Sequence, residues 1–122
     1  MSFAPPDVLT ELPKMTPAQL DALGFGVVGL TDGGDITKYN KYQSDLAGVP
    51  QAQALGKAFF KDVAPCTQNG LFYHQFKKGV EAGKLEASFP YTFTCKMTPT
   101  DVAVQLYRDP ATRTNWVLVK RS

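Results

Sequence analysis

The chain has 122 residues, which is enough for one domain with a single hydrophobic core. Its formal net charge of +2 is small and evenly spread, which argues against nucleic acid or an anionic membrane as a partner. No apolar run reaches the length of a membrane span, and the amino terminus lacks the pattern of a signal peptide. Two cysteines are too few for a disulfide framework, so we expect reduced thiols and a cytoplasmic location.

The first third of the chain predicts an amino-terminal segment followed by a hairpin. The proline-rich first residues predict an irregular lead-in with at most a short helix. Thr16, followed by proline and then glutamine, is typical of a helix start, and Gly24 of its end. The apolar run FGVVGL at 25–30 predicts a central strand, whose two glycines indicate close approach by other atoms. The turn at 32–35 predicts a hairpin, with 36–39 as its second strand.

The middle of the chain predicts helices. Asn40 is a suitable cap for a short helix over 41–46, which would end at the glycine two residues later. Residues 50–55 predict another short helical piece. Apolar residues at helical spacing from 71 to 80 predict a longer helix, with Gly83 at its exit.

The last third predicts strands. From 85 to 97 every odd position is apolar, which indicates one long strand with one buried face. Pro90 cannot donate a ladder hydrogen bond, so part of this strand should lie at an edge or a bulge. Two further strands are predicted at 102–107 and 116–120. Strands, then helices, then strands predict an α+β fold: a five-stranded antiparallel sheet with helices packed on a face.

The stretch GKAFFKDVAPCT at 56–67 presents Cys66 directly after Pro65, which stiffens the chain. Its thiol suits either a buried packing residue or an anchored nucleophile. His74 is the sole histidine, and it falls on a predicted solvated helix face, so a thiol enzyme is weakly supported. Cys95 lies on the apolar face of its strand and is predicted to be core, and no metal-ligand spacing is present.

Several other side chains have both a structural and a functional interpretation. Tyr39 is either a half-exposed strand tyrosine or a hydroxyl directed between sheet and helices, where the amide of Gln43 could converge with it. The aromatic side chains at odd positions from 89 to 93 are either core or a flat wall for a planar ligand. Trp116 has the same two interpretations.

Taken together, these residues resemble the photoactive yellow protein family, small blue-light receptors with a PAS fold. The resemblance is close over 56–67 and runs from about residue 15 to residue 121, including QLDALGFG, FKKGVEAGKL, YTF, KMTPT and WVLVKR. It implies a single PAS domain over 1–122, with an amino-terminal cap at 1–24, a core at 25–122 and helices inserted between the second and third strands.

The resemblance implies that Cys66 carries p-coumaric acid (4-hydroxycinnamic acid) as a thioester, with its ring held as a phenolate. Tyr39 occupies the position of the tyrosine that holds this phenolate, whereas Gln43 replaces the family's glutamic acid. The other implied pocket positions are Ala47 in place of a threonine, Val49 in place of an arginine that covers the ring, Tyr91 in the aromatic wall, Phe93 beside the chromophore, Met97 linked to thermal return and Cys95 in place of a tyrosine.

The implied function is a photocycle without enzymatic turnover. Light isomerises the chromophore, the phenolate takes up a proton, and a loosened signalling state reverts in the dark. We expect a monomer that signals to an unidentified downstream protein. Because Gln43 has no titratable proton, we expect the proton to come from solvent or another donor. The alternatives are a PAS-type module for another small ligand or for protein interaction and, third, a thiol enzyme using Cys66 and His74.

Overall fold

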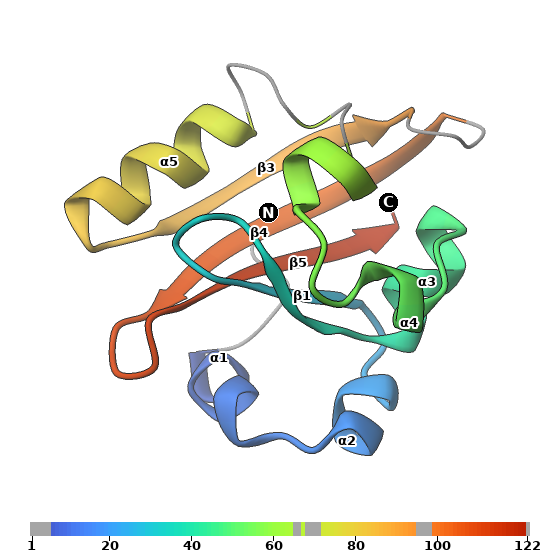
Figure 1. Cartoon of the computed structure of the whole chain (residues 1–122), viewed down its shortest axis with the longest axis horizontal. Helices are drawn as coiled ribbons and strands as arrows, with labels where there is room; N and C mark the ends of the chain where they lie inside the picture. Colours follow the sequence, from blue (N-terminus) through green and yellow to red (C-terminus); the bar gives the residue numbers. More distant parts are fainter. Residues whose placement is uncertain (1–5, 65–66, 68–71, 95–98, 122) are drawn as a thin grey trace.

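The computed structural model describes residues 6–64, 67, 72–94 and 99–121, so Cys66, Cys95 and Met97 lie outside the described residues. The described part forms one five-stranded antiparallel sheet with strand order β2-β1-β5-β4-β3 (Figure 1). Its strands are β1 (Gly26–Leu30), β2 (Ile36–Tyr39), β3 (Glu86–Phe93), β4 (Thr100–Asp109) and β5 (Thr114–Arg121). The helices are α1 (Pro6–Glu11), η1 (Leu12–Lys14), α2 (Pro17–Asp21), α3 (Lys41–Ala47), α4 (Gln51–Ala54), η2 (Phe59–Val63) and α5 (Tyr73–Ala82). The predicted α+β arrangement is confirmed.

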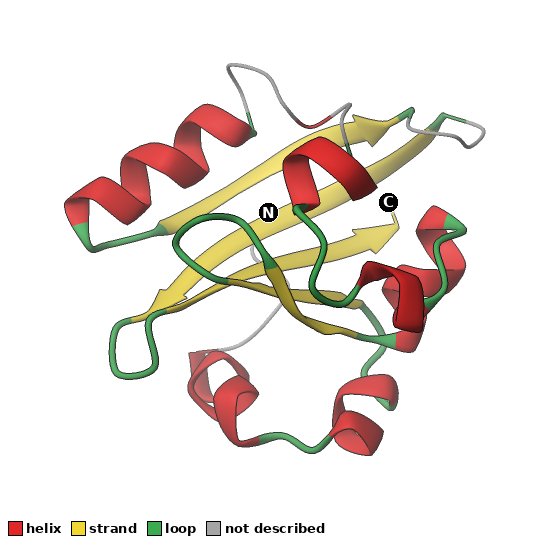
Figure 2. Cartoon of the chain, viewed as in Figure 1, coloured by secondary structure: helices red, strands yellow, loops and turns green. Residues whose placement is uncertain are grey.

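The sheet separates two hydrophobic cores. The helices between β2 and β3 contribute to the larger core, which lies on one face of the sheet. The amino-terminal helices bury leucines against β1 and β5 in the smaller core, so helices flank the strands on both sides (Figure 2). Trp116 belongs to this smaller core, together with Val27 and Leu118. Of its two interpretations, core packing is therefore confirmed, and it lies in a different core from Phe89 and Phe93.

The predicted helix boundaries have local causes. Thr16 caps α2 in a reciprocal capping box: its hydroxyl accepts from the Gln19 backbone N–H at 3.2 Å, and the Gln19 side chain accepts from the Thr16 N–H at 2.9 Å. Gly48 and Gly83 follow α3 and α5 with φ of 71° and 70°, the left-handed conformation that favours glycine. The predicted ends of these two helices are confirmed.

The lead-in is more helical than the sequence predicts. Two consecutive helical segments, α1 and η1, occupy 6–14, where the sequence predicts at most a short helix. They form because Leu9 and Leu12 are buried against the sheet, and tertiary packing of this kind overrides weak local propensity. The apolar residues after Gly56 form a π-helix, in which the Ala64 N–H donates to the Phe59 carbonyl at 2.7 Å.

The strands follow the predicted alternation but differ in length. Along β3 the odd positions are buried or half-buried and the even positions exposed, and Pro90 lies on an edge strand, as predicted. The sequence predicts one strand over 85–97, and β3 ends at Phe93 within the described residues. Residues 95–98 lie outside the described residues. β4 and β5 are longer than expected because their pairing continues to Asp109 opposite Thr114, at the hairpin turn.

A polar cluster joins the first hairpin turn to the β4–β5 hairpin. The Arg108 guanidinium donates to Asp32 at 2.5 Å and to the Asn115 side-chain carbonyl at 2.9 Å. The Asn115 amide in turn donates to Asp32 at 2.9 Å. The hydrogen bond from Arg108 holds the pKa of Asp32 below its ordinary value of 3.8.

Asp32→Asn is expected to lower the free energy of unfolding at neutral pH by about 1 kcal/mol or less, because the carboxylate is 46 % exposed. A lowered pKa in the folded state gives stabilisation that is present above pH 3.8 and lost as pH falls through the folded value. Urea titrations at about pH 7 and about pH 3 measure this difference, which should narrow at the lower pH. Asp35→Asn is the control, because Asp35 is exposed. A difference in free energy of unfolding between wild type and Asp32→Asn that stays constant with pH contradicts the prediction.

Candidate functional site

Two buried polar side chains flank the junction between β2 and α3. The side chains belong to Tyr39, at the end of β2, and Gln43, in the first turn of α3, and they are 5 % and 2 % exposed. Within the described part of the chain, the Tyr39 hydroxyl and the Gln43 carbonyl oxygen have no hydrogen-bond partner. Buried polar atoms without partners are costly and therefore rare. The junction thus offers polar groups that a buried ligand could satisfy.

The protonation state of Tyr39 makes it a donor. Burial raises the pKa of Tyr39 to about 12, so the hydroxyl keeps its proton at physiological pH. Gln43 has no titratable group, and its amide can donate through N–H or accept through its carbonyl. The two side chains therefore offer an O–H and an amide N–H as donors, and the structure shows no direct bond between them.

Asn40 fixes the junction from inside. Its side-chain oxygen accepts from the N–H groups of Val27 at 2.9 Å and Gln43 at 3.1 Å. Its amide donates to the carbonyls of Leu20 at 2.8 Å and Phe25 at 2.9 Å. The predicted helix cap is confirmed, and three of the four bonds reach beyond the helix to the amino-terminal segment and β1. The local cap motif predicts the bond to Gln43 alone.

Gly26 makes room for Gln43. A Cβ added at this β1 glycine would collide with the Gln43 side-chain oxygen and would lie 3.3 Å from the Val119 carbonyl. A larger residue here would force the Gln43 side chain to shift, so glycine lets α3 place its buried amide against the sheet. This confirms the close approach that the glycines of the apolar run 25–30 predict.

The two sequence departures at the end of α3 lie nearer the surface. Ala47 and Val49 are both half-buried, and Val49 packs against the larger core. The Val49 carbonyl accepts a hydrogen bond from the Ser44 hydroxyl at 2.8 Å. Val49 also lines an open pocket of about 660 Å³, together with Asp62 and Val63. Solvent can therefore reach the side chain of Val49.

The aromatic line on β3 is covered by one further ring. Phe72 is fully buried, and its ring centroid lies 5.5 Å from that of Phe89, 5.3 Å from Tyr91 and 6.3 Å from Phe93. The rings of Phe89 and Tyr91 meet Phe72 edge to face, a favourable aromatic geometry. The sequence placed Phe72 on a helix without a role at the site. In the structure Phe72 immediately precedes α5, and its ring joins the aromatic cluster through contacts with residues of β3 that are distant in sequence.

The structure brings four of the predicted site residues into one core, because Tyr39, Val49, Tyr91 and Phe93 all belong to the larger hydrophobic cluster. Gln43 is buried in the helix that follows Tyr39. The predictions for Cys66 and Met97, and that of a core position for Cys95, fall outside the described residues.

Other groups within the described residues bear on the alternative functions. His74 is exposed on α5, as predicted. No group of three or more potential metal-binding side chains occurs in the described ranges, and none of their helices is long and apolar enough to cross a membrane.

The fold is that of a PAS domain, and the junction places unpartnered polar groups in its core. Comparison with solved structures supports the fold: a PAS domain of an HTR-like protein from Haloarcula marismortui superposes with a TM-score of 0.67 at 13 % identity, covering 93 % of this chain and 99 % of that one. The photoactive yellow protein domain of the sensor histidine kinase Ppr from Rhodospirillum centenum superposes with a TM-score of 0.88 at 31 % identity, covering 92 % and 98 %.

Curated relatives identify the family. The chain is 38 % identical to photoactive yellow protein from Rhodothalassium salexigens over 121 residues, which covers 99 % of this chain and 97 % of that protein. It is 35 % identical to photoactive yellow protein from Halochromatium salexigens, covering 98 % and 95 %. No family model matches the chain. The chain belongs to the photoactive yellow protein family, whose members are PAS-fold photoreceptors and not enzymes.

Proposed function

We propose that this protein is a blue-light photoreceptor that carries p-coumaric acid as a thioester on Cys66. Family membership supports this proposal. The observation that carries it is the buried Tyr39 hydroxyl, which has no partner in the described structure and lies in the same core as Phe93. A phenolate oxygen is an acceptor that satisfies such a hydroxyl, and burial without donors would be very costly for it.

The described residues fit this group at its phenolate end. Tyr39 would donate its O–H, and Gln43 would donate through its amide N–H. Phe93 and Tyr91 would supply apolar walls, whereas Val49 would leave the ring partly open to solvent. When bound, the group supplies visible absorption, light-driven trans–cis isomerisation of its vinyl bond and a phenolate that can be protonated.

The residues of the junction explain why the illuminated state would be less stable. If an acceptor bonded to the Tyr39 hydroxyl were to move away, that buried hydroxyl would again lack a hydrogen-bond partner among the described residues. That penalty is about 1–3 kcal/mol for each unsatisfied group, which favours local opening and entry of water. Return of the acceptor in the dark would remove this penalty, so the Tyr39 hydroxyl would favour recovery.

The proton for the phenolate would come from solvent. Gln43 has none to give, and Tyr39 retains its own because its pKa is about 12. The open pocket beside Val49 brings water toward this part of the core. Buffer-dependent protonation rates would support this route, and rates independent of buffer concentration would contradict it.

The test is reconstitution of the full chain with the anhydride of p-coumaric acid. The proposal predicts a yellow, covalent adduct that bleaches under blue light and recovers in the dark. A colourless protein contradicts the photoreceptor proposal. A PAS-type binding module would instead retain a ligand without photochemistry, and a thiol enzyme would show turnover that depends on Cys66 and His74.

The cellular setting stays a prediction. We propose a cytoplasmic monomer that passes its signal to a separate protein. Light scattering of the pigment in the dark and under illumination measures its mass. A dimer in the dark contradicts the proposed monomer.

A further inference from the structure

The backbone at the β2–α3 junction is also held from outside, by side chains of two other elements. The Gln51 amide, from α4, donates to the Tyr39 carbonyl at 3.0 Å. The Asp21 carboxylate, at the end of α2, accepts from the Lys41 N–H at 2.8 Å. Lys41 is the first residue of α3, so this carboxylate satisfies one of the helix N–H groups that have no partner within the helix.

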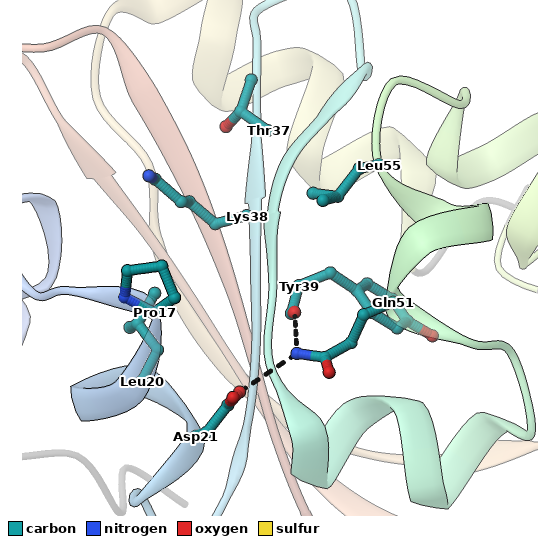
Figure 3. Close-up of a pocket in the computed structure, with 8 residues that line it drawn as sticks. All are labelled: Pro17, Leu20, Asp21, Thr37, Lys38, Tyr39, Gln51 and Leu55. Atoms are coloured by element: carbon teal, nitrogen blue, oxygen red, sulfur yellow. Dashed lines mark hydrogen bonds between the residues drawn. The ribbon is translucent and has the colours of Figure 1, made fainter.

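These two side chains also bond each other. The Gln51 amide nitrogen donates to the same Asp21 oxygen at 3.1 Å, as Figure 3 shows together with its bond to the Tyr39 carbonyl. The amide nitrogen has two protons, so both are used. Three separate segments thus meet in one hydrogen-bonded cluster: the amino-terminal α2, the core helix α4 and the junction at Tyr39.

The position of this cluster makes it sensitive to movement of α2. It lies in the lining of an open pocket of about 170 Å³, with Pro17 and Leu20 of the amino-terminal segment on one side and Leu55 on the other. Leu55 is 48 % exposed, and Asp21 is exposed as well, so water can replace the hydrogen bonds when the segment moves. The bonds of Asn40 are buried, which makes them far more costly to break.

We propose that Asp21 and Gln51 are positioning residues that make the geometry of the Tyr39–Gln43 donor pair depend on docking of the amino-terminal segment. With α2 docked, Asp21 orients the Gln51 amide toward Tyr39 and holds the first turn of α3, which carries Gln43. When α2 leaves, the Lys41 N–H loses its acceptor and Gln51 loses its orientation. Because coupling is reciprocal, disruption at the donor pair also weakens docking of α2.

The first test measures the dark recovery of the pigment, so this part of the inference rests on the proposed function. In the reconstituted pigment, Asp21→Ala and Gln51→Leu should each slow dark recovery after a flash by about fivefold or more, which corresponds to about 1 kcal/mol in the recovery barrier. The double variant should be no slower than the slower single variant, because both changes break one link. Gln53→Leu on the same helix is the matched control and should recover at the wild-type rate, because its side chain is exposed.

A second measurement does not need the pigment. Amide hydrogen exchange of the apoprotein should show faster exchange at Lys41 in Asp21→Ala, and faster exchange in α2 in Gln51→Leu. Asp21→Asn keeps a carbonyl acceptor and should restore protection at Lys41. If wild-type protein forms no pigment, the proposed function fails, while the exchange data still test the link.

Two results would overturn the inference. The first is a wild-type exchange rate at Lys41 in Asp21→Ala together with a wild-type rate of dark recovery. That result would mean that the bond between Asp21 and the Lys41 N–H does not stabilise the first turn of α3. The second is additive effects of the two single variants, because independent losses of stability add whereas breaks in one link do not.

Discussion

Replacing Cys66 with alanine is expected to abolish the yellow adduct completely. The thiolate is the nucleophile that attacks the activated carboxyl of p-coumaric anhydride, expelling p-coumarate and leaving a thioester. Alanine has no atom that can form this bond. Mass spectrometry of the intact protein measures the outcome: wild type should gain one coumaroyl group, and Cys66→Ala should gain none.

Cys95→Ala is the matched control, because the chain has two cysteines and each variant removes one. This variant should still gain the coumaroyl group. Labelling that persists in Cys66→Ala and disappears in Cys95→Ala would move the attachment site to Cys95 and overturn the proposed arrangement.

Gln43→Glu is expected to move the absorption maximum of the pigment to shorter wavelength. Glutamic acid would be 2 % exposed at this position if it kept the place of the glutamine, and such burial raises a carboxyl pKa and keeps the group neutral. A carboxylic O–H is a stronger donor to a phenolate than an amide N–H. It therefore localises more negative charge on the phenolate oxygen in the ground state. This widens the energy gap between the ground state and the excited state of the chromophore. A difference of about 1–2 kcal/mol between the donors gives a shift on the order of ten nanometres.

Gln53→Glu controls for the added carboxyl, because Gln53 is exposed on α4 and its variant should keep the wild-type colour. An unchanged or red-moved maximum in Gln43→Glu counts against the proposed donor pair. Time-resolved infrared spectra provide a second check. Loss of a carboxylic-acid band during phenolate protonation should occur in Gln43→Glu and not in wild type, where Gln43 has no acid proton.

The sequence predicts the framework well because its signals are local. Alternation along residues 85–93, the capping box at Thr16 and the glycines after α3 and α5 each depend on neighbours within a few positions. For the lead-in the sequence predicts at most a short helix, and the second helical segment there depends on packing against a distant part of the sheet. The lengths of β4 and β5 likewise depend on pairing between strands.

For the candidate site too, some features are predictable from the sequence and others are not. The resemblance supplied Tyr39 and Gln43, and the structure shows that both are buried. It gave no sign of the bond between Asp21 and Gln51, which joins residues 30 positions apart. Nor did it predict that a Cβ at Gly26 would collide with Gln43. Contacts of this kind arise when separate elements pack, and a single sequence carries no local pattern for them.

Trp116 gives this molecule an internal optical probe. It is the one tryptophan in the chain, it is 1 % exposed, and it lies in the core shared by the amino-terminal helices and the sheet. Its indole N–H has no partner in the described structure, so water that reaches it gains a hydrogen bond. Tryptophan emission therefore reports hydration beneath the amino-terminal segment, while visible absorption reports the opposite core. One sample can be followed at two wavelengths, and the order of the two signals shows which core opens first.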